Sequence, residues 1–216
     1  MSGAPEILWR ARGALVIDKP AGLAVHAGRA GGPSVEDFFP LWRAGRNGPW
    51  LAHRLDTDTA GCLVVALKKT ALLEIQAAFA AHGVHKTYWA VVQGAPVQAE
   101  GVIDAPLLKA TQGRAWKMAV SPAGQGAVTQ WRVLAAGQGR ALVAFYPRTG
   151  RTHQIRAHAA HIGHPIMGDA VYGGGPGALQ LLARAIRLEA LGGVIAAEAP
   201  VPAHMRAAVE ACGGAL

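Results

Sequence analysis

The sequence contains only two cysteines, Cys62 and Cys212, and they lie far apart in the chain. They form no CxxC pair and no metal-ligand spacing, so the sequence gives no support to a cysteine metal site and fits a reducing compartment. The N-terminus lacks the charged start and apolar run of a signal peptide. No stretch approaches the roughly 20 apolar residues of a membrane span. We therefore expect a cytoplasmic protein with no membrane partner.

Acidic residues are also few, with 13 Asp+Glu against 21 Lys+Arg, a formal net charge of +8 and a pI of about 10.1. This excess favours a polyanionic partner such as RNA, DNA or an anionic lipid surface, without choosing among them. The alternative is that the charge serves solubility or reflects an Arg-rich composition, since Arg far outnumbers Lys. Charge alone therefore does not assign a function.

The chain shows no internal repeat and no linker. Its 216 residues, 51% of them hydrophobic, suffice for one core, so we expect a single domain over residues 1–216. Short Gly/Pro-rich stretches at 27–33, 45–49 and 172–177 are each followed at once by ordered-looking sequence, which predicts surface loops.

Hydrophobic periodicity predicts strands mixed with helices in no regular βαβ rhythm. Such a pattern indicates an α+β domain built on a largely antiparallel sheet. The strands are expected at 14–18, 62–67, 88–93, 127–135 and 140–146, the last two as a hairpin. The helices are expected at 70–82 with Thr70 as N-cap and Gly83 as the stop, at 151–162, near 177–190 and at 203–211.

One candidate site lies in the segment HRLDTDTAG, residues 53–61. It places His53 and Arg54, which can carry positive charge, beside the carboxylate of Asp56 just before a strand. An isolated Asp-x-Asp in such a position more often forms an Asx-turn or a cap, at Asp56 or at Asp58. The segment by itself therefore leaves both interpretations open.

The second candidate is RTGRTHQIRAHAAHIGHPIMGDAVYGG, residues 148–174. On a helix beginning near Thr152, side chains three or four positions apart share a face, which directs several donors the same way. Its histidines are either capping and surface residues or metal ligands. The predicted helix contains no acidic or thiolate companion for them and Gly163 interrupts it, so we expect no metal.

Together these segments resemble the signature blocks of RluA-type pseudouridine synthases. The blocks occur in one order: VIDKPAGLAVH (16–26), HRLDTDTAG (53–61), HKTYWAVVQG (85–94) and GRTHQIRAHAAHIGHPIMGDAVYG (150–173), followed by APVPAHM (199–205). The resemblance spans nearly the whole chain and implies the pseudouridine synthase catalytic fold. It implies isomerisation of specific uridines in structured RNA, in a tRNA anticodon stem-loop, in 23S rRNA or in both.

The resemblance also implies roles for particular residues. Asp56 matches the essential aspartate, Tyr88 the tyrosine that stacks on the target base, and Arg156 the arginine that pairs with the aspartate. Arg54 matches an arginine that helps to open the RNA, and Lys19 lies in a loop near the site. The implied substrate-binding set is Arg54, His53, Lys19, Arg151, His153 and Ile155.

The chemistry fits these residue types. A carboxylate can attack C1′ of the ribose as a nucleophile or remove a proton from C2′, and the sequence does not choose between these routes. Neither route needs a cofactor, so none is expected. Burial would raise the pKa of Asp56, and a guanidinium at Arg156 would oppose that shift.

Two departures from the family pattern affect details rather than the reaction. Ala60 stands where the family usually has Ser, and Leu182 stands where a His is common. The chain begins almost at the first block, so we expect recognition by the catalytic domain itself, without an S4-like module, and a monomer. The alternatives are a basic RNA-binding module without catalysis and a metal-dependent hydrolase built on the histidines.

Overall fold

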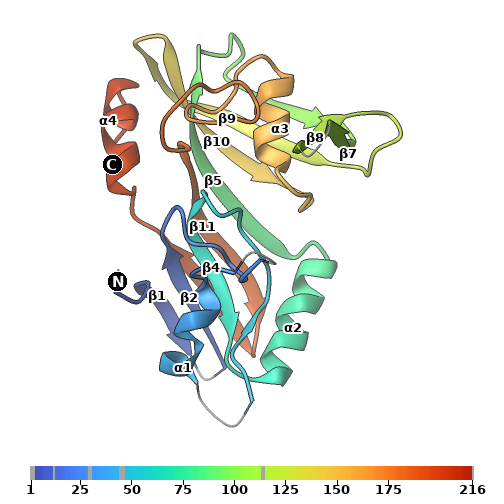
Figure 1. Ribbon diagram of the computed structural model, residues 1–216, viewed down its shortest axis with the longest axis vertical. Helices are drawn as coiled ribbons and strands as arrows, with labels where there is room; N and C mark the ends of the chain where they lie inside the picture. The colour runs from blue at the N-terminus through green and yellow to red at the C-terminus, as the bar shows by residue number, and fades with distance from the viewer. Residues whose placement is uncertain (1–2, 12, 29–30, 44–46, 113–114, 216) are drawn as a thin grey trace. The chain divides into compact units, whose positions relative to one another are not determined.

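The computed structural model describes residues 3–11, 13–28, 31–43, 47–112 and 115–215. Within them the chain divides into two compact units, Met1–Lys86 with Ala183–Pro200, and Thr87–Leu182 with Val201–Leu216. Each unit contains an antiparallel sheet with helices beside it (Figure 1), which confirms the predicted α+β class. The expectation of a single domain over 1–216 stays a prediction.

The first unit is built around two paired strands, β2 (Ala14–Lys19), which is apolar in its first four residues, and β4 (Ala60–Ala66), which carries no charged residue. Burial of every residue of β4 shows that both faces of this strand are covered, which explains the unbroken apolar run in its sequence. Strand β2 pairs antiparallel with β4, so that Lys19 lies opposite Gly61. The elements are β1 (Ile7–Ala11), β2 (Ala14–Lys19), the 3-10 helix η1 (Val35–Phe38), α1 (Phe39–Trp42), β3 (Trp50–Leu51), β4 (Ala60–Ala66), α2 (Lys69–Ala80) and β12 (Gly193–Glu198).

In the second unit, strands β5, β10, β9 and β6 follow one another in the sheet. Its elements are β6 (Glu100–Asp104), β7 (Leu107–Gln112), β8 (Ala115–Val120), β9 (Val128–Gly137), β10 (Arg140–Pro147), α3 (Gln154–His161) and α4 (Ala203–Ala211). Strands β5 (Val84–Gln93) and β11 (Leu181–Ala190) each begin in one unit and end in the other.

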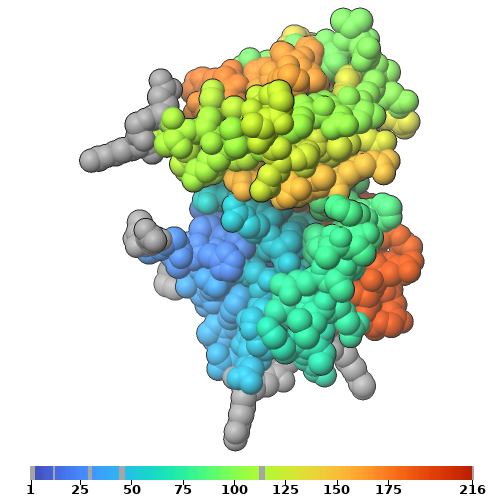
Figure 2. All heavy atoms as spheres, turned by 90° about the vertical axis from the view of Figure 1, so that its right-hand side faces the viewer, coloured from blue at the N-terminus to red at the C-terminus, as the bar shows by residue number. Residues whose placement is uncertain are grey.

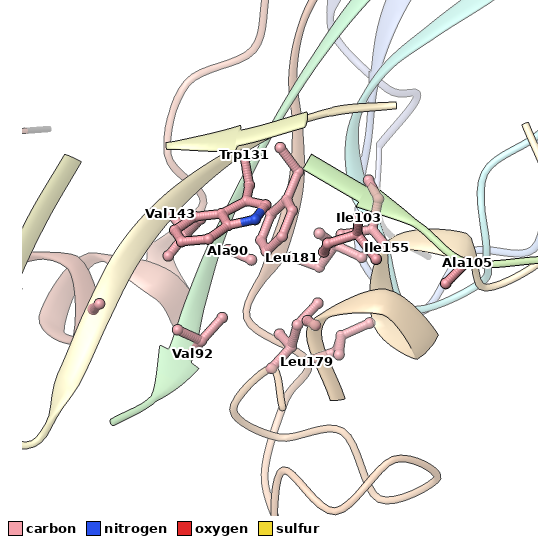
Figure 3. Close-up of a cluster of buried hydrophobic side chains, with 13 residues drawn as sticks. Ala90, Val92, Ile103, Ala105, Trp131, Val143, Ile155, Leu179 and Leu181 are labelled. Atoms are coloured by element: carbon pink, nitrogen blue, oxygen red, sulfur yellow. The ribbon is translucent and has the colours of Figure 1, made fainter. Parts of the chain in front are cut away.

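One face of the sheet in this unit carries a cluster of buried hydrophobic side chains, to which α3 contributes (Figure 3). Alternate residues of a strand point to opposite faces, so Val143 faces the cluster while Leu142 points away from it. Helix α3 contributes Ile155 and Ala159, and β9 contributes Trp131. This packing fixes the orientation of α3, the helix that carries Arg156.

Most predicted elements are confirmed, and their ends move by a few residues. The strands at 14–18, 62–67 and 88–93 and the 127–146 hairpin correspond to β2, β4, β5 and β9–β10, and the final helix to α4. Helix α2 begins at Lys69 with Lys68 at its N-cap, so the predicted cap at Thr70 is wrong. The loop at 172–177 contains no helix or strand, whereas the loops at 27–33 and 45–49 lie partly outside the described residues.

The helix predicted near 177–190 is wrong, because Leu181–Ala190 forms strand β11. The Leu, Ala, Arg and Glu in this segment favour a helix, but pairing with β12 outweighs that preference. The sequence did contain the correct signal, since apolar Ile186 and Leu188 alternate with charged Arg187 and Glu189.

Candidate functional site

In the first unit, Asp56 lies in a turn just before β4. The amide of Thr59 donates to the Asp56 carbonyl at 3.1 Å, which closes the turn. The amide of Gly22 donates to the Thr57 carbonyl at 2.9 Å, so the loop after β2 is attached to this turn. Gly22 has φ of +85°, a conformation in which a glycine carries no penalty. The backbone around Asp56 is therefore held from two sides.

Lys19 joins the same two loops from inside the protein. Its side chain is completely buried, and Nζ donates to the carbonyls of Pro20 at 2.9 Å, Leu23 at 2.7 Å and Thr57 at 2.8 Å. Burial lowers the pKa of Lys19 to about 8, and the carboxylates of Asp58 and Asp56 oppose that shift. Because its three donors meet three carbonyl oxygens, the geometry favours a positioning role over the expected substrate contact.

Replacing Lys19 by Met should destabilise the protein. Met has a similar length but leaves the carbonyls of Pro20, Leu23 and Thr57 without this donor, so we expect a loss of about 2–4 kcal/mol in the free energy of unfolding. Urea denaturation measures it, with the exposed Lys68→Met as the control for the loss of one charge. Equal stability of the two variants would contradict the anchoring role.

His53 is held by contacts within the first unit. Its Nε2 accepts a hydrogen bond from the Val64 amide at 3.0 Å, and its ring packs on Phe79 with centroids 4.9 Å apart. Burial, with a further contribution from Lys86, lowers the pKa of His53 to about 4. His53, which can carry a positive charge, is therefore neutral at neutral pH, and its contact with RNA stays a prediction. Arg54 is exposed, and its contact with RNA stays a prediction.

In the second unit, Arg156 is buried on α3 and forms an ion pair with Asp169. Its Nε donates to Asp169 Oδ2 at 2.7 Å and its Nη2 to Oδ1 at 2.9 Å, which is the two-bond geometry available to a guanidinium. Asp169 Oδ1 also accepts hydrogen bonds from the backbone amides of Val171 and Tyr172. The sequence had not singled out Asp169, although it lies in the quoted GRTHQIR block. The pairing of Arg156 with Asp56 stays a prediction.

An Asp169→Asn variant should unfold more easily, because it leaves the buried guanidinium of Arg156 beside a neutral amide. We expect a loss of about 3–5 kcal/mol in the free energy of unfolding. The matched control is Glu100→Gln, which likewise replaces the carboxylate by an amide, in the exposed pair with Arg132, and should cost less than about 1 kcal/mol. Equal melting temperatures for the two variants would show that Asp169 does not hold Arg156.

The start of α3 is fixed by a buried glutamine that the sequence did not identify as structural. Gln154 Oε1 accepts from the Arg151 amide at 3.0 Å and from Thr149 Oγ1 at 2.7 Å. Its Nε2 donates to the Val128 carbonyl and to Thr129 Oγ1. The helix begins at Gln154, later than the predicted start near Thr152.

His158 is buried on the same helix, with Nε2 3.0 Å from the Ala105 carbonyl and Nδ1 2.9 Å from Thr129 Oγ1. Burial lowers the pKa of His158. Because the Ala105 carbonyl can only accept, Nε2 is the donor in that hydrogen bond. The expectation of a capping or surface histidine is wrong at this position, because His158 packs inside the unit. Among the described residues, no three His, Cys, Asp or Glu side chains form a candidate metal group. That the protein needs no metal or cofactor stays a prediction.

The remaining predicted site residues occupy different surroundings. Tyr88 is partly buried and packs against the hydrophobic cluster, opposite Phe145 in the sheet. Ile155 is itself part of that cluster, which gives it a structural place. Arg151 is exposed and donates from Nε to the Gly126 carbonyl, and His153 precedes α3 with φ of +51°. Their contacts with RNA stay predictions.

Comparison with known proteins identifies similar chains. The family model described as RNA pseudouridylate synthase matches residues 13–161. An RNA pseudouridine synthase of Zymomonas mobilis, described as uncharacterized, is 44% identical over 79% of this chain and 79% of its own length. The ribosomal large subunit pseudouridine synthase D of Pseudomonas aeruginosa is 42% identical over 78% of this chain, which spans about half (53%) of that relative.

The structural comparison agrees with the sequence comparison. The human RNA pseudouridylate synthase domain containing 4 superposes with a TM-score of 0.81 at 27% identity, covering 96% of this chain and 92% of its own. In the described part of the chain, no helix has the length and apolar character needed to span a bilayer.

Proposed function

Because the chain belongs to the RNA pseudouridylate synthase family, we propose that it isomerises specific uridines of structured RNA to pseudouridine. The observation that carries this proposal is the family match over residues 13–161, which includes Asp56, Tyr88 and Arg156. The name of the Pseudomonas relative supports a uridine of the large ribosomal subunit as substrate. A tRNA anticodon stem-loop is the other proposed substrate.

Asp56 is the proposed catalytic carboxylate. As a nucleophile it would bond to C1′ while the N1–C1′ bond breaks, and as a base it would take a proton from C2′ to give a glycal. In both routes the uracil turns and C5 bonds to C1′. This breaks the bond between Asp56 and C1′ in the first route, and in the second route C2′ regains its proton from Asp56. C5 then loses its proton, which reaches solvent, and N1 gains one. Hydrogen bonds from Lys19 and Gly22 fix the turn that contains Asp56. This supports the role, because a reacting group must be held in a defined position relative to its substrate.

Arg156 is the proposed partner of that carboxylate. Burial favours the neutral form of a carboxylic acid, and a permanently charged guanidinium favours the ionised form that the reaction needs. Asp169 orients the guanidinium through Nε and Nη2. Tyr88 would offer a flat face to the uracil, and Arg54 would offset the cost of turning the uridine out of its stack.

The test uses RNA labelled with tritium at C5 of uridine, since each isomerisation releases one tritium to water. Purified protein is incubated with transcripts of the tRNAs and of 23S rRNA. We expect release from one transcript class, with the modified position then mapped by mass spectrometry of RNA digests. No release from either class would overturn the proposed activity on these RNAs.

We propose that the protein acts as a monomer in the cytoplasm. The excess of basic residues supports contact with the phosphates of RNA. Salt should therefore weaken binding through the release of counterions.

A further inference from the structure

We propose that Trp116, on the β7–β8 hairpin, is a stacking platform for a base of the substrate RNA, and that Lys109, whose ammonium group lies over the ring, is displaced by the base and binds the adjoining phosphate. This inference rests on the proposed function, because it takes RNA as the substrate. It adds a recognition position outside the residues already assigned to the reaction.

The hairpin register places the two side chains on one face. Strands β7 and β8 pair antiparallel, with Lys109 opposite Met118 and Thr111 opposite Trp116. Residues two apart on a strand share a face, and diagonal neighbours across a pair lie within reach of long side chains. The Lys109 Nζ accordingly lies over the Trp116 ring, 4.8 Å from its centroid, so a stacked base would move this ammonium group aside. Leu108 belongs to the opposite face.

The Trp116 ring is held from beneath by the segment that begins α3. His153 stacks on it with centroids 5.0 Å apart and an interplanar angle of 23°. The His153 ring packs edge to face on the Tyr172 ring, with centroids 5.8 Å apart. The Tyr172 hydroxyl accepts a hydrogen bond from the Met118 amide at 2.8 Å. An aromatic ring supported in this way is already oriented before a ligand arrives, which lowers the entropic cost of binding.

The same ring is open to solvent. Trp116 is 41% exposed, and Lys109 is exposed as well. Figure 2 shows the yellow-green atoms of this part of the chain at the surface. An exposed aromatic ring next to a cation is the combination that binds single-stranded nucleic acid, because the ring takes a base and the cation takes the backbone.

The platform is connected to the proposed reaction through Tyr172. Arg156 Cζ lies 5.4 Å from the centroid of the Tyr172 ring. The Tyr172 ring in turn contacts the ring of His153. A base on Trp116 is thus separated from Arg156 by His153 and Tyr172. This spacing assigns Trp116 to a base that flanks the target uridine, while the target itself is left to Tyr88.

The experiment compares a single-stranded decauridylate with a decamer of the same ribose-phosphate backbone lacking bases. Fluorescence anisotropy at one fixed salt concentration gives the affinity of each probe. For Trp116→Ala we expect decauridylate affinity to fall about 5- to 150-fold, with the abasic decamer unchanged. Trp116→Phe, which keeps a flat ring, should recover most of the loss.

The matched control is Leu108→Ala, which removes an exposed apolar side chain from the opposite face of the same hairpin. We expect it to leave both affinities unchanged. Lys109→Ala should weaken both probes alike, because a phosphate contact does not depend on bases. An equal loss on both probes in Trp116→Ala would mean that the ring is only structural, and no loss on either would also overturn the proposal.

The binding test is independent of catalysis. Tritium release by the wild-type protein tests the proposed function, whereas the base-dependent loss of affinity tests Trp116. A wild-type protein that releases tritium while Trp116→Ala binds decauridylate normally would overturn the platform alone. If the wild-type protein releases no tritium while Trp116→Ala loses affinity for decauridylate alone, the proposed reaction is overturned and the proposed role of Trp116 stands.

Discussion

An Asp56→Asn variant is expected to fold and bind RNA while losing pseudouridine formation by more than about 1,000-fold. Asn keeps the size and one acceptor oxygen of Asp, but it is neither a nucleophile nor a base. The turn around position 56 is held by backbone carbonyls, which the substitution leaves in place. Tritium release under single-turnover conditions measures the chemical step, and anisotropy measures binding.

The control for this variant lies two residues away. Asp58 is exposed on the same segment, and its carboxylate, like that of Asp56, favours the charged form of Lys19. Asp58→Asn therefore removes the same charge from the same surroundings, and we expect it to keep turnover within a few-fold of wild type. Loss of turnover in both variants to the same degree would assign the effect to local charge and would refute Asp56 as the reacting group.

The fold was predictable where local pattern and tertiary structure agree. The apolar runs of β2 and β4 and the turn between β9 and β10 carry their signals within a few residues, and these elements are confirmed. Leu181–Ala190 was not predicted correctly, because its helix-favouring residues are held in a strand by partners distant in sequence. Strands β6, β7 and β8 were not identified from the sequence at all.

The site was predictable only in part, for the same physical reason. Motif resemblance pointed to Asp56, Tyr88 and Arg156, and these roles stay predictions. It did not reveal that Asp169 pairs with Arg156, since the partners are brought together by the turn after α3. Nor did it reveal that Lys19 is buried, because the three carbonyls that receive its ammonium group belong to two loops separated in the sequence.

A Tyr88→Phe variant is expected to bind RNA like the wild type and to lose turnover by about 100-fold or more. The ring packs against the hydrophobic cluster, and Phe preserves that packing and the flat face for the uracil. What it loses is the hydroxyl, which we expect to move the proton at C5. Tyr88→Leu should lose binding as well, by about 5- to 150-fold, the worth of one stacked base.

Single-turnover rates measured against RNA concentration separate these effects, because the plateau reports chemistry and the half-saturation point reports binding. The control is Trp89→Phe, a change of ring at the neighbouring position, which strand alternation places on the opposite face of β5. If Tyr88→Phe is as active as the wild type, the hydroxyl is not needed, and the proton leaves by way of water or Asp56. Small and equal effects of Phe and Leu on both quantities would identify Tyr88 as an ordinary packing residue.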